Sequence, residues 1–180
     1  MKNKRSTVIE VATALFAEHG FEKTSVAKIC EVSNVSKGLV YHHFKSKDEI
    51  LEEIFTSTTQ KMLALSKSTT GDSPKNQLID LITAIFSQLK DDKLFYQLNL
   101  SIMFQPSTKK LLSAHIKDRS SALLAHTKEI FSAIDPAQSA KLSYIFIAEI
   151  DGVSLDYLSV FEEYPLEEIE DYLIHKYKNL

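Results

Sequence analysis

The sequence predicts an all-α fold with about nine helices, and three observations support this fold class. Apolar residues recur at three- and four-residue spacing, the four prolines fall at expected helix boundaries, and there is no sustained period-two run. With 180 residues, 44% of them hydrophobic and 25% charged, the composition is that of a soluble globular protein. We expect a small N-terminal domain over residues 1–47 and a larger helical domain over residues 48–180.

The first helix is expected over about residues 6–19, where Val8, Ala12 and Leu15 share one face. Gly20 then reads as a left-handed C-cap, after which Phe21 folds back onto the helix.

Three short helices follow within residues 24–51, and each begins at a hydroxyl residue. Thr24 or Ser25 opens the first, Ser36 the second and Ser46 the third, because their side-chain oxygens can accept hydrogen bonds from free N–H groups of a first turn. Ser46 with Glu49 also fits a capping box.

A tight turn at residues 33–35 separates the first two of these helices. Asn34 is the residue there that best tolerates a positive φ angle. Helix, short turn and short helix form the helix-turn-helix motif, whose second helix enters the DNA major groove. That helix, about residues 36–43, contains Gly38, which suits close approach to DNA but also fits an ordinary surface helix that tolerates a glycine.

The net charge of −3 is divided unevenly along the chain. Residues 1–47 hold eight Lys or Arg and four Asp or Glu, a net charge of +4, whereas residues 48–180 hold 13 basic and 20 acidic side chains, a net charge of −7. The basic excess coincides with the motif, which indicates a DNA-binding surface on an acidic body.

Roughly the first 50 residues resemble the TetR family of bacterial transcriptional repressors. The resemblance lies in residues 15–21 (LFAEHGF), 24–26 (TSV), 35–38 (VSKG) and 41–47 (YHHFKSK). Asn34 stands where the family usually has glycine, and Val40 stands where many members have an aromatic or polar residue. The resemblance covers the remaining 130 or so residues only in helical layout.

The motif and the resemblance together predict the residues that contact DNA. Lys37, with Ser36 and His42, would contact base edges, and Gly38 would allow close approach. Phosphate contacts are expected from the basic N-terminal arm, from the start of the first motif helix, from the end of the second, and from the start of the long helix that follows. These residues are Lys4, Arg5, Thr24, Ser25, Tyr41, His43 and Lys47.

Beyond the motif we expect a long helix over residues 47 to about 68, which is long enough to transmit a change in the body to the motif. A further helix begins at Pro74, and others are expected over about 92–104, 107–133, 136–161 and 165–178. Ser73 and Asp135 would cap helices that carry proline at their first position.

Residues 136–161 carry apolar side chains on two faces, which indicates burial on both sides. The resemblance implies that the last two helices form a four-helix interface in a homodimer, although this helix would also suit the centre of a monomer core. The expected interface residues are Ile145, Ala148, Gly152, Leu155, Ile169 and Leu173.

The resemblance also implies a pocket for an effector among the helices between residues 47 and 133. A small apolar or amphipathic molecule would suit its apolar and polar side chains, which would equally suit an ordinary helical core. The candidate lining residues are Phe86, Phe95, Tyr96, Asn99, Met103, His115, Arg119, Tyr144 and Glu149.

Several other kinds of protein find no support in the sequence. Cys30 is the only cysteine, so an intrachain disulfide is excluded and a reducing cytosol is expected. We expect no cofactor, metal site or catalytic centre, because no metal-binding or phosphate-binding motif is present. Neither a secretion signal nor an apolar run long enough to span a membrane is present, which predicts a cytoplasmic protein.

The sequence thus predicts a ligand-responsive transcriptional regulator that is not an enzyme. It would bind a palindromic or pseudo-palindromic operator as a homodimer, act as a repressor and be released by a small molecule. Two alternatives remain, which are control by a protein partner instead of a small molecule, and activation instead of repression.

Overall fold

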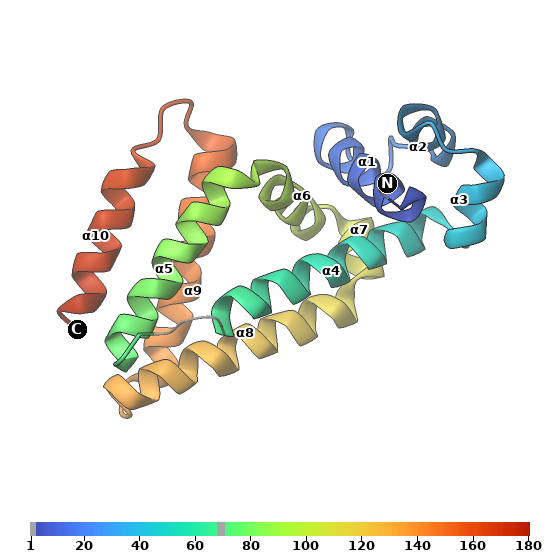
Figure 1. Ribbon diagram of the computed structural model, residues 1–180. Coiled ribbons are helices and arrows are strands. Elements are labelled where there is room, and N and C mark those ends of the chain that lie inside the picture. Colours follow the sequence, from blue (N-terminus) through green and yellow to red (C-terminus); the bar gives the residue numbers. More distant parts are fainter. Residues whose placement is uncertain (1–2, 68–70) are drawn as a thin grey trace. The chain divides into compact units, whose positions relative to one another are not determined.

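The computed structural model describes residues 3–67 and 71–180, and within these residues every regular element is an α-helix except one π turn (Figure 1). This confirms the all-α prediction. The elements are α1 (Lys4–His19), α2 (Val26–Ser33), α3 (Lys37–His43), α4 (Lys47–Lys67), α5 (Pro74–Asp91), α6 (Lys93–Phe104), α7 (Pro106–Leu111), α8 (Ser113–Ile134), α9 (Ser139–Leu155), the π turn η1 (Asp156–Val160) and α10 (Leu166–Lys178). The predicted end of the long helix near residue 68 lies outside the described residues.

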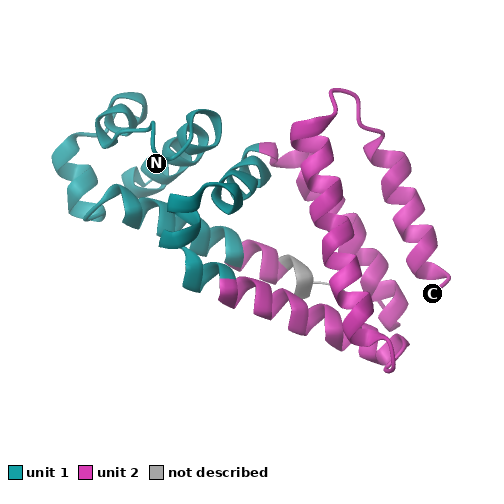
Figure 2. Ribbon diagram, turned by 180° about the vertical axis from the view of Figure 1, so that it is seen from behind, with its two compact units in different colours: residues 1–59, 94–116 teal, residues 60–93, 117–180 magenta. Residues whose placement is uncertain are grey.

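The chain forms two compact units (Figure 2). Unit 1 contains residues 1–59 and 94–116, and unit 2 contains residues 60–93 and 117–180. Unit 1 therefore holds the whole segment expected to bind DNA, but it also includes the first part of α4 together with α6 and α7.

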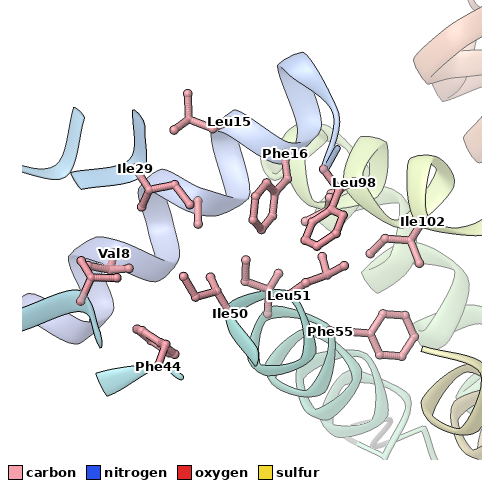
Figure 3. Packing of buried hydrophobic residues seen from close by; sticks show 14 of the residues in the cluster. Val8, Leu15, Phe16, Ile29, Phe44, Ile50, Leu51, Phe55, Leu98 and Ile102 are labelled. Carbon is pink, nitrogen blue, oxygen red and sulfur yellow. The ribbon is translucent and has the colours of Figure 1, made fainter. Parts of the chain in front are cut away.

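The core of unit 1 joins the N-terminal helices to a segment from the middle of the chain (Figure 3). Phe16 from α1, Ile29 from α2 and Leu51 from α4 are fully buried. Leu98 and Ile102 of α6 belong to the same cluster. Burial of apolar side chains is the main favourable term in folding, so residues 94–116 help to stabilise the N-terminal helices.

Local capping follows the hydroxyl residues of the sequence. The Ser25 side chain accepts from the Lys28 N–H at 3.1 Å, Ser36 from the Leu39 N–H at 3.3 Å and Ser46 from the Glu49 N–H at 3.1 Å. Ser25, and not Thr24, therefore caps α2. The Glu49 carboxylate accepts from the Lys45 N–H, one residue before the partner that a capping box predicts.

Both ends of α1 differ from the prediction. The helix begins at Lys4 because the Asn3 side chain accepts from the Arg5 N–H at 3.1 Å and caps it. Lys4 and Arg5 therefore lie in its first turn instead of in a separate arm. Gly20 has a positive φ of 84°, but its ψ of 152° lies outside the left-handed helical region, so the predicted C-cap conformation is wrong.

The helix expected over residues 107–133 is divided into α7 and α8. The break falls at Leu112, whose side chain is completely buried in the unit 1 core and whose ψ of 12° departs from the helical value. No glycine or proline marks this break, and the sequence gives no local signal for it.

The helix expected over residues 136–161 starts later and ends earlier. Residues 136–138 form a turn, in which the Asp135 carboxylate accepts from the N–H groups of Ala137 and Gln138, both at 3.1 Å. Asp135 therefore caps a turn, and α9 begins at Ser139. After Leu155 the helix widens into η1.

In unit 2, α10 packs against α5 and is fastened to α9 by a polar cluster. The Tyr177 hydroxyl donates to Glu149 at 2.8 Å, and the Lys176 ammonium also pairs with the Glu149 carboxylate. Around the Tyr177 ring lie Phe131 and Phe146, with ring centroids at 5.9 and 5.4 Å. A helix that could cross a membrane is not found among the described residues.

Candidate nucleic-acid interface

Helix α3 presents a polar face above a buried apolar one. Val40 and Phe44 are 1% and 2% exposed and anchor the helix in the unit 1 core. Four residues of α3 are exposed to solvent, and so is its N-cap residue. These exposed residues are Ser36, Lys37, Gly38, Tyr41 and His42.

The turn between α2 and α3 has the conformation that the sequence predicts. Asn34 adopts φ 50° and ψ 45°, the left-handed region. The following residue, Val35, is buried, and its N–H donates to the Cys30 carbonyl at 3.2 Å. The turn therefore fixes α3 against α2 through both backbone and core contacts.

Gly38 lies in open space. A Cβ atom built at this position would meet nothing within 4 Å, so packing inside the protein does not require the glycine. A bare backbone on the exposed face of α3 leaves room for a partner to come close.

Two predicted contact residues retain donors for an external partner. Lys37 is exposed, and its ammonium nitrogen lies 5.8 Å from the centroid of the Tyr41 ring, one helical turn further along. The hydroxyl of the exposed residue Ser25 accepts the cap hydrogen bond of α2, which leaves its own O–H to donate outward.

The two histidines at the end of α3 differ in exposure. His42 is exposed, whereas His43 is half-buried between its neighbours. The ring centroids of His42 and His43 lie 5.2 Å apart, and those of His43 and Phe44 lie 6.3 Å apart. Packing thus orients the His43 ring, while His42 remains open to a partner.

The two basic residues of the first turn have different surroundings. Lys4 is exposed. Arg5 forms an ion pair with Glu53 of α4 at 2.9 Å, and its guanidinium carbon lies 5.2 Å from the centroid of the Phe44 ring. Arg5 therefore links α1, α4 and the end of α3, and a phosphate would have to compete with Glu53 for it.

The prediction of a phosphate contact for Thr24 is corrected by its position. Its side chain is only 3% exposed, and its hydroxyl donates to the carbonyls of Leu15 at 3.2 Å and Gly20 at 2.9 Å. Thr24 therefore shapes the turn between α1 and α2 from inside.

Lys47 also differs from the prediction. Its ammonium donates to the carbonyls of Phe21 at 2.7 Å and Thr24 at 3.0 Å, instead of extending from the surface. The side chain is half-buried. In sequence, Lys47 looks like any other lysine beside a DNA-binding motif, because its partners come from a distant turn.

Five of the predicted pocket residues belong to unit 1. Phe95 and Tyr96 are buried with ring centroids 4.9 Å apart, and the Asn99 amide donates to the Phe95 carbonyl at 2.8 Å. By contrast, Met103 and His115 are exposed within the chain. The His115 ring centroid lies 6.4 Å from that of Phe55.

The other four predicted pocket residues belong to unit 2 and have unlike surroundings. Phe86 is fully buried and Arg119 is 9% exposed. Tyr144 is 63% exposed and so does not line an enclosed cavity in the chain, and Glu149 is engaged by Lys176 and Tyr177. The exposure of Tyr144 therefore contradicts its prediction as a pocket residue, whereas a pocket role for Glu149 stays a prediction.

An electrostatic pair lies inside unit 2. Burial lowers the pKa of Arg119 to about 10, and the Asp151 carboxylate acts in the opposite direction. Burial of the carboxyl group raises the pKa of Asp151, although the residue as a whole is exposed, and Arg119 opposes that shift. Burying a charge is costly unless an opposite charge lies near it, and the Asp151 carboxylate offsets part of that cost for Arg119.

Two open clefts are lined by residues other than those predicted to line the effector pocket. One, of about 370 Å³ in unit 2, is lined by Lys90, Tyr157, Tyr164 and the start of α10. The other, of about 400 Å³ in unit 1, lies where the end of α1 meets the junction of α6 and α7. None of the nine predicted pocket residues lines either cleft.

The predicted dimer residues mostly lie on an open face of α9. Ile145, Ala148 and Gly152 are exposed, and a Cβ atom at Gly152 would meet nothing within 4 Å. Leu155 and Ile169 are half-buried. Leu173 is only 4% exposed and packs within its own unit, which corrects its prediction as an interface residue.

One tyrosine extends this open face beyond the predicted set. Tyr144 is 63% exposed and adjacent to Ile145 on α9, and a second exposed tyrosine, Tyr172, lies on α10. The four-residue spacing of Tyr144, Ala148 and Gly152 was present in the sequence as a signal.

Comparison with known proteins gives consistent results. Residues 8–54 match the family described as bacterial regulatory proteins, tetR family. The chain is 29% identical over 163 residues to the uncharacterised HTH-type transcriptional regulator YuxN of Bacillus subtilis, a match that covers 88% of this chain and 55% of YuxN. It is 28% identical over 90 residues to the transcriptional repressor KstR2 of Mycolicibacterium smegmatis, which covers 49% of this chain and 44% of KstR2. The chain thus spans about half the length of these curated relatives.

Solved structures share the whole fold. The fatty acid degradation regulator FadR of Bacillus halodurans has a TM-score of 0.84 at 19% identity, over 99% of this chain and 96% of that one. A transcriptional regulator from Aquifex aeolicus has a TM-score of 0.76 at 22% identity, over 98% of this chain and 99% of that one. The helix-turn-helix geometry, the match over residues 8–54 and the shared fold lead to one conclusion: the chain belongs to the TetR family of bacterial transcriptional regulators.

Proposed function

We propose that this regulator binds double-stranded DNA as a homodimer, with one α3 helix of each protomer in a major groove, and represses transcription until a small molecule releases it. The observation that carries the proposal is the exposed polar face of α3 above its buried anchors Val40 and Phe44. A helix held in this way can enter a groove without unfolding its own core.

Base reading is assigned to the exposed end of α3. Lys37 can donate to guanine O6 and N7, and Ser36 and His42 can donate to or accept from neighbouring base edges. Ser25, Tyr41 and His43 would contact phosphates, with Lys4 beside them. The net charge of +4 over residues 1–47 supports attraction to a polyanion.

The homodimer is assigned to the open face of α9 and to α10. Tyr144, Ile145 and Ala148 form an exposed apolar stripe, and Gly152 lets a second helix come close. Two-fold pairing of this stripe would bring together two copies of α3, which read half-sites about 34–36 Å apart or a multiple of that distance.

The effector is assigned to the helical interior of unit 2. Phe86 offers an apolar wall, and Arg119, which is 9% exposed and interacts electrostatically with Asp151, offers a buried charge that could orient the polar end of an amphipathic molecule. Repression is favoured over activation because KstR2, 28% identical over 90 residues, and the probable acrEF/envCD operon repressor of Escherichia coli, 39% identical over 51 residues, are both named as repressors.

The test is selection of bound duplexes from a random-sequence pool, followed by a screen for compounds that release the enriched duplex. The proposal predicts an enriched sequence with two-fold symmetry and a complex that contains two chains per duplex, as measured by light scattering. Failure to enrich any duplex would contradict DNA binding, and an enriched site without symmetry would contradict the dimer.

A further inference from the structure

Lys47 is the first residue of α4, and its ammonium group is fully engaged within unit 1. It donates to the Phe21 carbonyl at 2.7 Å and to the Thr24 carbonyl at 3.0 Å. Its nitrogen also lies 4.1 Å from the centroid of the Phe21 ring, a distance typical of a cation–π contact. An ammonium has three N–H donors, so two carbonyls and one ring face account for all of them.

The carbonyls that Lys47 binds belong to the turn that connects α1 to α2. This turn starts at Gly20, whose φ is 84°, and ends at Ser25, the N-cap of α2. Inside the turn, the Thr24 hydroxyl donates to the carbonyls of Leu15 and Gly20. The turn is therefore held from inside by Thr24 and from α4 by Lys47.

The same contacts argue against a phosphate contact for Lys47. Hydrogen bonds from an ammonium are roughly twice as strong as those between neutral groups. To reach a phosphate, Lys47 would have to give up two of them and the ring face of Phe21. Lys45, two residues earlier, is exposed and is a more accessible cation at the same end of the motif.

We propose that Lys47 is a positioning residue for DNA binding and not a phosphate ligand. It fixes the first turn of α4 to the turn before α2, and α2 in turn packs against α3. Because α4 runs from unit 1 into unit 2, Lys47 attaches the helix-turn-helix to the helix that both units share. The proposal rests on DNA binding as the function of α3.

The test compares Lys47→Met with Lys45→Met, a matched variant that removes an exposed charge. Binding to a duplex enriched by the wild-type protein from a random pool is measured over a series of potassium chloride concentrations. Lys47→Met should weaken binding by about tenfold at every salt concentration, with the slope of log K against log salt unchanged. A slope that becomes shallower by about 0.9 per phosphate that the variant no longer neutralises would overturn the proposal.

Hydrogen exchange gives a second measurement that needs no DNA. Lys47→Met should speed the exchange of the amides of residues 24–29, whereas Lys45→Met should leave them unchanged. Unchanged exchange in Lys47→Met would overturn the positioning role even if affinity falls. Failure to enrich any duplex would contradict the proposed function, and the exchange result would still decide whether Lys47 holds the turn.

Lys47→Arg decides the question if the methionine variant does not fold. Arginine keeps the charge that a phosphate would need, but its planar guanidinium does not reproduce an ammonium placed between two carbonyls and a ring. A positioning role predicts weaker binding and faster exchange of residues 24–29. Wild-type values for both would overturn it.

Discussion

At the scale of single residues, Gly20 has the most demanding backbone conformation among the described residues. Its φ of 84° with ψ of 152° lies in a region that is essentially restricted to glycine. Space is not the constraint, because a Cβ atom there would lie 3.5 Å from the Gln105 side-chain nitrogen, an ordinary contact. The identity of this residue follows from the backbone of the turn that Lys47 and Thr24 hold.

Gly20→Ala should therefore lower the free energy of unfolding by about 1–3 kcal/mol, as measured by urea denaturation. Gly38→Ala is the control, because Gly38 is helical and in open space. There the same change should stabilise the protein by up to about 1 kcal/mol. Equal effects at the two positions would contradict the conformational explanation for Gly20.

Lys37→Ala tests base reading by a single exposed side chain. A lysine that contacts guanine contributes to discrimination between bases by about 1–3 kcal/mol. The variant should therefore lose more affinity for the selected duplex than for random duplex, as measured by competition binding. An equal loss on both duplexes would limit Lys37 to phosphate contact.

At the scale of elements, α10 depends on a few side chains for its attachment to α9. Tyr177 is 1% exposed, and its hydroxyl donates to Glu149. Burial raises the pKa of Tyr177, and the hydrogen bond to Glu149 and the charge of that carboxylate raise it further. The neutral phenol is therefore the form that the fold stabilises.

Alkaline pH should weaken this attachment. The folded pKa of Tyr177 lies above its unfolded value, so its contribution is complete below the unfolded pKa of about 10 and is lost as pH rises toward the folded value. Urea denaturation at pH 9 and pH 11 should show a fall in stability in the wild type. Tyr177→Phe should be less stable at pH 9 but show a smaller fall, and an unchanged fall would assign the pH dependence to other groups.

The elements also show which features the sequence could predict. The caps Ser25 and Ser36 accept from N–H groups three residues away, and Asn34 adopts the left-handed conformation of a tight turn. Both features depend on neighbouring residues alone, so the sequence was enough to predict them. The roles of Thr24 and Lys47 depend on carbonyls that the tertiary fold brings near, 9 and 26 residues away for Leu15 and Phe21. Their residue types alone suggested phosphate contacts instead.

Breaks in the helices were harder to predict for a related reason. The break falls at Leu112, a leucine that is completely buried in the unit 1 core, and leucine is a good helix former. Likewise, Leu173 and Tyr144 both fit apolar positions of a helix, and only packing shows that the first is buried and the second exposed. A single sequence shows which face of a helix is apolar, but it does not show which element packs against that face.

At the scale of the whole molecule, the open stripe of α9 predicts how the chain associates. Ile145→Glu should shift the proposed dimer toward monomer, because it places a charge in an apolar interface while leaving the protomer core intact. Sedimentation velocity measures the shift, and Ser132→Glu on the exposed side of α8 is the control. A dimer that survives Ile145→Glu would place the interface elsewhere.

The joint core of unit 1 has a consequence for synthesis on the ribosome. The N-terminal helices share their core with Leu98, Ile102 and Leu112, so the nascent chain cannot complete this unit until these residues have emerged. The helix-turn-helix should therefore reach its full stability only after more than half of the chain has been translated. A truncated translation product that ends soon after α4 would carry the recognition sequence without the core that holds it in shape, and such a fragment should not occupy the operator.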